Sequence, residues 1–222
     1  MCLNKKFEVK ENMTVTWHAG AMDTEANTLS SIKTALDANA DIVEFDVSSL
    51  PDGTPVIIHA DFADDPTLPT LEDALKLTAQ YEKTSINLDM KNTVCVKQVD
   101  ELVHKYGLEK RAFYTGINED WIDAVKNNST LPCYLNAHPR EKEKLLSDAA
   151  DGFMKNAISL GVAGININFR EITPAFLSAV KKYNLPLSVW TPSNDIDIML
   201  ALEMKPDNIT SRRPDIVKKY IK

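Results

Sequence analysis

Short runs rich in β-branched and aromatic residues alternate along the chain with longer segments in which apolar residues recur every three or four positions. The short runs predict β-strands and the longer segments predict amphipathic helices. Eight strands are expected, over residues 14–18, 41–47, 85–90, 111–115, 132–136, 164–169, 187–191 and 207–211. Eight helices are expected, over residues 28–39, 71–81, 94–106, 119–127, 140–160, 174–183, 196–204 and 214–220.

This alternation favours a parallel sheet, and eight strand–helix units is the number that closes a (β/α)₈ TIM barrel. The alternative is an open, doubly wound parallel sheet. No Gly-x-Gly-x-x-Gly follows any predicted strand, which argues against a dinucleotide-binding sheet. Because the 222 residues contain no Pro/Gly/Ser-rich linker, we expect residues 1–222 to form one domain.

Composition narrows the classes of function. The net charge of −7 argues against nucleic-acid binding. The chain has no run of 18 apolar residues and a polar start, so we expect neither a transmembrane helix nor a signal peptide, and a cytoplasmic location. Cys2, Cys95 and Cys133 lie far apart without Cys-x-x-Cys spacing, as expected of reduced, partly buried thiols in an intracellular protein. The oligomeric state is left open.

One segment interrupts the alternation of strands and helices. Asp52-Gly53 separates two extended, apolar-rich runs, which predicts a β-hairpin after the second strand, with a two-residue turn. With these two residues at the turn centre, Asp46 is expected opposite His59, and Glu44 opposite Asp61. The hairpin would then carry acidic groups and a histidine to one face of the second strand.

Chemistry-bearing side chains gather at the predicted carboxyl ends of the strands, where active sites of such barrels lie. Glu44, Asp46 and Asp89 stand inside otherwise apolar strands, where a carboxylate is costly unless it is paired or bound to metal. They predict a site for a hard divalent cation, Ca²⁺ or Mg²⁺. Zinc is disfavoured, because neither His-x-His nor His-Glu-x-x-His spacing is present. Two histidines beside such a cation, His18 and His59, suggest acid–base chemistry and make phosphodiester cleavage a natural use.

The motifs that carry these residues resemble the glycerophosphodiester phosphodiesterase family. The resemblance runs through WHAG, EANT, the strand VEFDV, the turn PDG, IIHAD, LPTLEDAL, INLDMK, LSVWTPSN and NITSRRPDIV, in order over nearly the whole chain. It implies a TIM barrel that hydrolyses glycerophosphodiesters to glycerol 3-phosphate and an alcohol, with Ca²⁺ or Mg²⁺ as cofactor. A small phosphodiester substrate is the partner implied.

The resemblance also assigns roles to single residues. It makes His18 and His59 the two catalytic histidines, and Glu44 and Asp46 metal ligands, with Asp89 as the third where the family usually has glutamate. It places Lys91 at the phosphate and Trp190 in the substrate pocket. Asp61, one position beyond the family's usual aspartate, is either an outer partner of the site or a surface residue. His138 lies on the active face by position, with a substrate role left open.

The sequence departs from the family pattern at positions that the resemblance assigns to phosphate binding and substrate recognition. Ala19 replaces an arginine, Ala26 a glutamate and Ala60 an aspartate, and a short insertion between His59 and Asp89 is missing. One arginine of the pair Arg212-Arg213 is a candidate to replace the first of these. Two alternatives therefore remain: a catalytically weak barrel that binds a phosphorylated ligand, and a lyase that stops at a cyclic phosphate.

Overall fold

A computed structural model describes residues 6–138 and 147–221. Its strands are β1 Thr14–Trp17, β2 Ile42–Ser49, β3 Pro55–Ile57, β4 Ser85–Met90, β5 Ala112–Ile117, β6 Cys133–Ala137, β7 Gly164–Asn168, β8 Leu187–Trp190 and β9 Asn208–Ser211. Its α-helices are α1 Leu29–Asp37, α2 Leu71–Thr78, α3 Val96–Lys105, α4 Ile122–Asn128, α5 Ser147–Ser159, α6 Pro174–Tyr183, α7 Asp195–Glu203 and α8 Pro214–Tyr220. Short 3₁₀ turns lie at η1 Ala21–Asp23, η2 Glu109–Arg111, η3 Glu119–Trp121 and η5 Phe169–Glu171.

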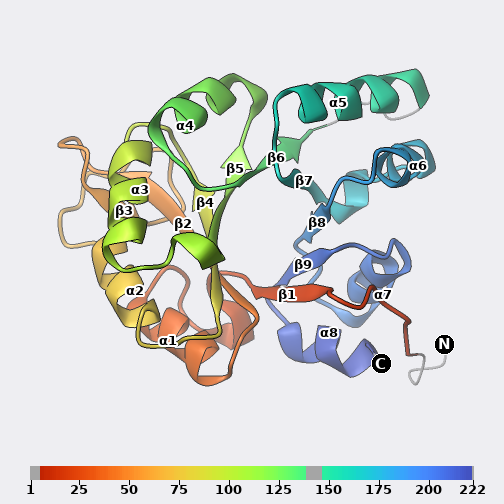
Figure 1. Ribbon diagram of the computed structural model, residues 1–222. Helices are drawn as coiled ribbons and strands as arrows, with labels where there is room; N and C mark the ends of the chain where they lie inside the picture. The colour runs from red at the N-terminus through yellow and green to blue at the C-terminus, as the bar shows by residue number, and fades with distance from the viewer. Residues whose placement is uncertain (1–5, 139–146, 222) are drawn as a thin grey trace.

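Eight parallel strands close into a ring. The order is β1-β9-β8-β7-β6-β5-β4-β2, and β1 pairs with both β9 and β2. Helices α1 to α4 flank one half of the ring and α5 to α8 flank the other (Figure 1). The expected TIM barrel is confirmed, and the open doubly wound sheet is excluded.

The predicted strands and helices correspond closely to the observed ones. Four helices start at a side-chain cap: the side chains of Thr28, Thr70, Thr173 and Asn194 each accept a hydrogen bond from a backbone N–H of the first turn of α1, α2, α6 and α7. For the helix expected over 140–160, residues 140–146 lie outside the described part of the chain, and α5 covers the remainder.

The two faces of each barrel strand have different surroundings. Along β2, Val43, Phe45 and Val47 belong to the hydrophobic core between sheet and helices, and the alternating Glu44 and Asp46 turn to the opposite, inner face. Buried polar groups of the barrel interior are satisfied across strands. The Asn208 Oδ1 accepts from Thr16 Oγ1 at 2.9 Å, and its Nδ2 donates to Ser188 Oγ at 3.0 Å. Inward-facing polar residues are therefore part of the barrel's construction, and its core lies outside the ring.

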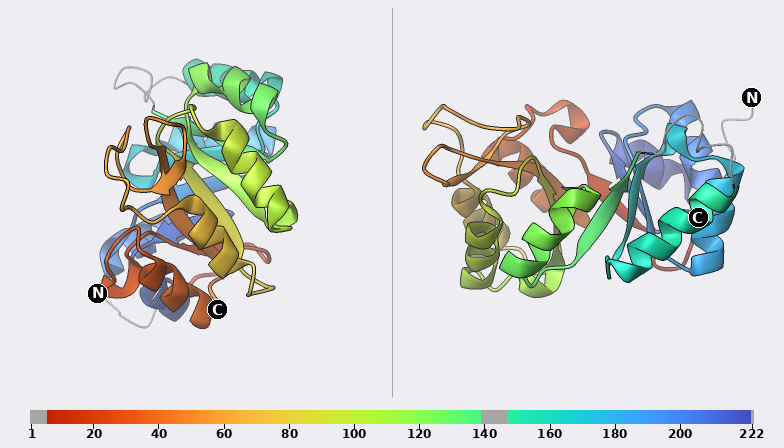
Figure 2. Two further views of the ribbon diagram at one scale, coloured as in Figure 1. Left: turned by 90° about the vertical axis from the view of Figure 1, so that its left-hand side faces the viewer. Right: turned by 90° about the horizontal axis from the view of Figure 1, so that it is seen from above.

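The hairpin after β2 is present, but its expected register was wrong. Strand β3 is antiparallel to β2 and lies outside the ring, with Val47 paired to Ile57; this segment projects at one side of the barrel (Figure 2). The next hydrogen bond runs from Ile58 N to Asp46 O at 3.1 Å, so Ile58 takes the place expected for His59.

The turn explains the shift by one residue. Gly53 N donates to Leu50 O at 2.9 Å, and Leu50 N donates to Thr54 O at 3.0 Å, which makes a three-residue loop. Pro51 favours the second position of a type I turn, and Gly53, with φ 88°, takes the left-handed position that follows. The proline therefore selects a loop one residue longer than Asp52-Gly53 alone would form.

The structure also bears on the expectations from composition. Cys95 and Cys133 are buried free thiols, and burial raises the pKa of Cys95 to about 11; Cys2 lies outside the described residues. Over residues 6–138 and 147–221, no helix combines the length and the apolar character needed to cross a membrane.

Candidate active site

Three carboxylates from the neighbouring strands β2 and β4 meet on the inner face of the barrel. Asp46 pairs in register with Asp89 on the neighbouring strand, and Glu44 lies on the same face as Asp46. One oxygen from each carboxylate lies within 4.8 Å of the others. Glu44 is 5% exposed and Asp46 is 2% exposed, so their charges are costly without a cation.

Neighbouring groups orient each carboxylate. The backbone N–H of Ala19 donates to Glu44 Oε2 at 2.7 Å. Asn27 holds Asp46 twice, because its Nδ2 donates to Asp46 Oδ2 at 2.8 Å and its Oδ1 accepts from the Asp46 N–H at 3.1 Å. Thr115 Oγ1, on β5, donates to Asp89 Oδ1 at 2.6 Å. Each of the three carboxylates is therefore held by at least one hydrogen bond from a neighbouring group.

Lys91 is the cation that the structure places among these carboxylates. Its Nζ lies 2.7 Å from Asp46 Oδ1 and also contacts Asp89 Oδ2. Burial alone would lower the pKa of Lys91, but the charges of Asp89 and Asp46 raise it above its ordinary value. Burial raises the pKa of Glu44 well above its ordinary range, and repulsion from Asp46 and Asp89 raises it further. One ammonium does not balance three carboxylates, so this set of oxygen donors fits a hard divalent cation.

His18 lies at the end of β1, with its ring fixed by the backbone. Nδ1 is 2.7 Å from the carbonyl oxygen of Ala19. Because a carbonyl oxygen only accepts, Nδ1 carries the hydrogen and the neutral ring keeps its lone pair on Nε2. Nδ1 is also 4.0 Å from Glu44 Oε2. Burial lowers the pKa of His18 below its ordinary value.

A cavity of about 230 Å³ joins these groups. Seven of the eight site residues expected from the sequence line it: His18, Glu44, Asp46, His59, Asp89, Lys91 and Trp190. His59, exposed and following β3, reaches this cavity although its expected pairing with Asp46 was wrong. Asp61 does not line it. The side chain of Asp61 is exposed, and its carbonyl oxygen accepts from Asn92 Nδ2 at 2.7 Å.

Other polar residues also line the cavity. Asn87 and Thr115 are joined by a hydrogen bond of 2.7 Å, and Asn166 Nδ2 donates to Asn136 Oδ1 at 2.9 Å. Within the described chain, Asn166 Oδ1 and Trp190 Nε1 are buried without a hydrogen-bond partner. In the sequence, asparagines at alternate positions of otherwise apolar strands were the signal that could have identified these lining residues. The role of Asn27 had a different sequence signal, its position just before the helix cap Thr28. Asn27 adopts φ 57° there, and asparagine is favoured in that conformation.

The two candidate arginines differ in their surroundings. Arg213 forms a two-bond ion pair with Asp215, at 2.9 and 2.6 Å. Arg212 is exposed, and its charge lowers the pKa of His18, after the larger effect of burial. Of the two arginines, only Arg212 thus exerts its charge on the site. Ala19 stands in this site where the family pattern has an arginine.

Solved structures with the same fold carry related descriptions. A glycerophosphodiester phosphodiesterase from Parabacteroides distasonis is 19% identical, with a TM-score of 0.76 over 95% of this chain and 97% of that chain. A phosphodiesterase from Oleispira antarctica, in complex with the product sn-glycerol-3-phosphate, is 18% identical, with a TM-score of 0.75 over 93% and 96%. A glycerophosphodiester phosphodiesterase from Thermotoga maritima is 16% identical, with a TM-score of 0.66 over 94% and 97%. Comparison with curated proteins gave no match.

Family membership follows from the sequence rather than from these structures. The model of the glycerophosphoryl diester phosphodiesterase family matches residues 18–67 and 60–216. The matched span begins at His18 and includes every residue assigned above to the cavity, from the acidic cluster to Trp190. The chain belongs to the glycerophosphoryl diester phosphodiesterase family, a family of phosphoric diester hydrolases.

Proposed function

We propose that this protein hydrolyses a glycerophosphodiester to glycerol 3-phosphate and an alcohol, with two histidines as acid and base. The observation that carries this proposal is the convergence of His18, His59 and the acidic cluster on one cavity at the carboxyl end of the barrel. The relative that was solved with sn-glycerol-3-phosphate supports the product named here. We further propose that residues 1–222 form one domain that carries the whole reaction.

The tautomer of His18 favours this histidine as the first base. Its Nε2 takes the proton of the glycerol 2-hydroxyl, whose oxygen forms a new bond to phosphorus. The bond from phosphorus to the oxygen of the leaving alcohol breaks, and His59 gives that oxygen a proton. A five-membered cyclic phosphate and the free alcohol result.

The second half of the reaction reverses the two roles. His59, now neutral, takes a proton from water, whose oxygen bonds to phosphorus. The bond from phosphorus to the 2-oxygen breaks, and His18 returns the proton to that oxygen. Both histidines are then in their starting states, and glycerol 3-phosphate is released.

The acidic cluster and its lysine support the phosphate. Glu44, Asp46 and Asp89 would hold Ca²⁺ or Mg²⁺, which when bound polarises a phosphoryl oxygen and offsets the negative charge of the site. Lys91, once its carboxylates are shared with the cation, is placed to bind a phosphate oxygen. Trp190 would form a wall of the cavity beside the glycerol.

Release of ethanolamine from glycerophosphoethanolamine tests the proposal. We expect turnover that needs Mg²⁺ or Ca²⁺ and is abolished by EDTA. His18→Ala and His59→Ala should each lower kcat by roughly 100-fold or more. His104→Ala, at an exposed histidine of α3, is the matched control and should leave kcat unchanged. Full activity in both site variants would exclude the two-histidine mechanism.

A further inference from the structure

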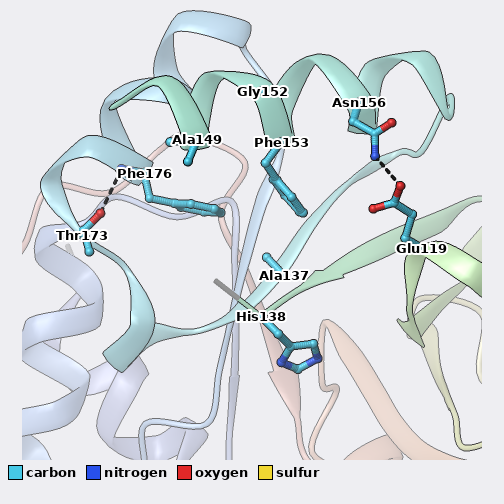
Figure 3. Close-up of a pocket in the computed structure, with 10 residues that line it drawn as sticks. Glu119, Ala137, His138, Ala149, Gly152, Phe153, Asn156, Thr173 and Phe176 are labelled. Carbon is cyan, nitrogen blue, oxygen red and sulfur yellow. Dashed lines mark hydrogen bonds between the residues drawn. The ribbon is translucent and has the colours of Figure 1, made fainter. Parts of the chain in front are cut away.

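A second cavity, of about 370 Å³, lies between α5, α6 and the end of β6 (Figure 3). Its volume exceeds that of the catalytic cavity. The catalytic cavity alone falls below the roughly 300–1,000 Å³ typical of small-molecule sites. The second cavity therefore offers room that a phosphodiester group by itself does not need.

The walls of this cavity are mainly apolar. The ring centroids of Phe153 on α5 and Phe176 on α6 lie 5.9 Å apart, and Ala137 and Ala149 also line the cavity. In Figure 3 the Phe153 ring extends from α5 toward the end of β6. These surfaces favour an apolar occupant.

The polar groups of the same cavity are already engaged with one another. Asn156 Nδ2 donates to Glu119 Oε1 at 2.8 Å, and the Thr173 hydroxyl caps α6 by accepting from Phe176 N at 3.2 Å. Both bonds are drawn in Figure 3. An occupant consequently needs no charge of its own to satisfy these groups.

One residue connects the second cavity to the catalytic one. His138, which follows β6, lines both. In Figure 3 its imidazole extends away from α5, on the side opposite to Phe153. The two cavities therefore adjoin at His138, and a molecule that occupies both would pass this residue.

We propose that the second cavity binds an apolar substituent of the substrate, so that the preferred substrates are phosphodiesters carrying an alkyl or acyl group. The inference rests on the proposed function and adds a substrate class to it. Two positions on the substrate satisfy this chemistry: the 1-hydroxyl of the glycerol, as an ester, and the leaving alcohol. Neither occupies the 2-hydroxyl, so the two-histidine reaction stays available to both.

A matched set of three short substrates tests the idea. Glycerophosphoethanolamine is the reference; its 1-hexanoyl derivative places the apolar group on glycerol, and glycerophosphohexanol places it on the leaving alcohol. Since each buried methylene contributes about 0.8 kcal/mol, we expect at least one apolar substrate to exceed the reference by about tenfold or more in kcat/KM, mainly through KM. The arm that shows the preference identifies which end enters the cavity.

A variant that fills the cavity separates binding there from general hydrophobicity. Gly152 lines the cavity, and a Cβ added to it meets no atom within 4 Å. The Cβ of Gly152→Leu therefore meets no neighbour, and the substitution also raises helix propensity in α5. We expect Gly152→Leu to bring the ratio of kcat/KM between the apolar substrate and the reference close to one. The kcat/KM for the reference substrate should stay unchanged. Lys155→Leu, at an exposed position of the same helix outside the cavity, should keep the preference.

The outcomes distinguish this inference from the function on which it rests. Hydrolysis of the reference with no preference in either apolar arm overturns the inference alone. A preference that survives Gly152→Leu also overturns it. Hydrolysis of none of the three with Mg²⁺ or Ca²⁺ overturns the proposed function, and the inference with it.

Discussion

The Nζ of Lys91 lies 2.7 Å from Asp46 Oδ1, in the midst of the three carboxylates proposed to hold a divalent cation. Lys91 is therefore the internal counter-ion of the cluster. Its side chain is 13% exposed, so little water screens the pair. The ammonium and a bound cation would neutralise the same carboxylates, which links the stability of the protein to metal binding.

Lys91→Met tests that link. Without metal the variant leaves the carboxylates uncompensated, and we expect it to lose roughly 2–4 kcal/mol in the free energy of unfolding. Binding of Mg²⁺ or Ca²⁺ to the folded state adds to its stability. The gain should be larger for the variant than for the wild type, because in the variant the cation supplies the positive charge that Lys91 no longer provides. Urea unfolding in EDTA and in excess metal measures both effects. Lys97→Met, at a 70% exposed side chain, is the control, and equal metal-free stability of K91M and wild type would refute the counter-ion role.

Replacement of Arg212 tests whether this exposed side chain supplies the phosphate contact that Ala19 lacks. Arg212→Ala should raise KM for glycerophosphoethanolamine about tenfold, the loss of one charge-assisted hydrogen bond of about 1.5 kcal/mol. Arg213→Ala removes a neighbouring arginine that is already paired with Asp215 and should leave KM unchanged. Steady-state kinetics of the two variants gives the comparison, and equal effects would show that neither arginine has a specific role at the phosphate.

How far the sequence predicted this site depends on the kind of interaction. Strand positions follow from periodicity, so the inward-facing strand residues Glu44 and Asp89 were placed correctly. The hairpin register depended on a turn conformation that Pro51 shifted by one residue. Asn27 and the backbone N–H of Ala19 hold the carboxylates through loop geometry, which hydrophobic patterning does not encode. The second cavity depends on how α5 and α6 pack, and no local pattern specifies such packing.

Gly116 fixes the approach of β5 to β4 beside the site. It adopts φ 75°, and an added Cβ would collide with the Met90 carbonyl oxygen and lie 2.9 Å from the Met90 N. We expect Gly116→Ala to cost roughly 3 kcal/mol, from backbone strain and from the collision. Gly107→Ala separates the two causes, because Gly107 has φ 67° with no atom within 4 Å of an added Cβ; it should cost about 1 kcal/mol. Equal losses of unfolding free energy would eliminate the collision as a cause.

Asp100 gives a pH dependence that does not involve the catalytic site. Burial alone would raise the pKa of Asp100, but hydrogen bonds from Ser129 and Thr130 lower it below its ordinary value. A lowered folded-state pKa means that this carboxylate stabilises the protein above its unfolded pKa of about 3.9, and that the contribution is lost as pH falls through the folded value. Asp100→Asn should cost about 1 kcal/mol at pH 6.

The stability difference between wild type and Asp100→Asn is the quantity to follow. Urea unfolding of both proteins from pH 6 down to pH 2.5 should show it shrinking below about pH 4. The comparison of two proteins removes the effects of other carboxylates. A difference that stays constant over this range would mean that the charge of Asp100 contributes nothing to stability.

Phosphorus NMR of glycerophosphoethanolamine incubated with the protein and Mg²⁺ or Ca²⁺ tests the central claim most directly. The account predicts that the diester signal is replaced by that of glycerol 3-phosphate, with a cyclic phosphate present at most transiently, and that His18→Ala and His59→Ala leave the diester intact. An unchanged diester with the wild-type protein would contradict hydrolysis and favour a barrel that only binds phosphorylated ligands. A cyclic phosphate that accumulates and persists would contradict the second half of the reaction and identify a lyase.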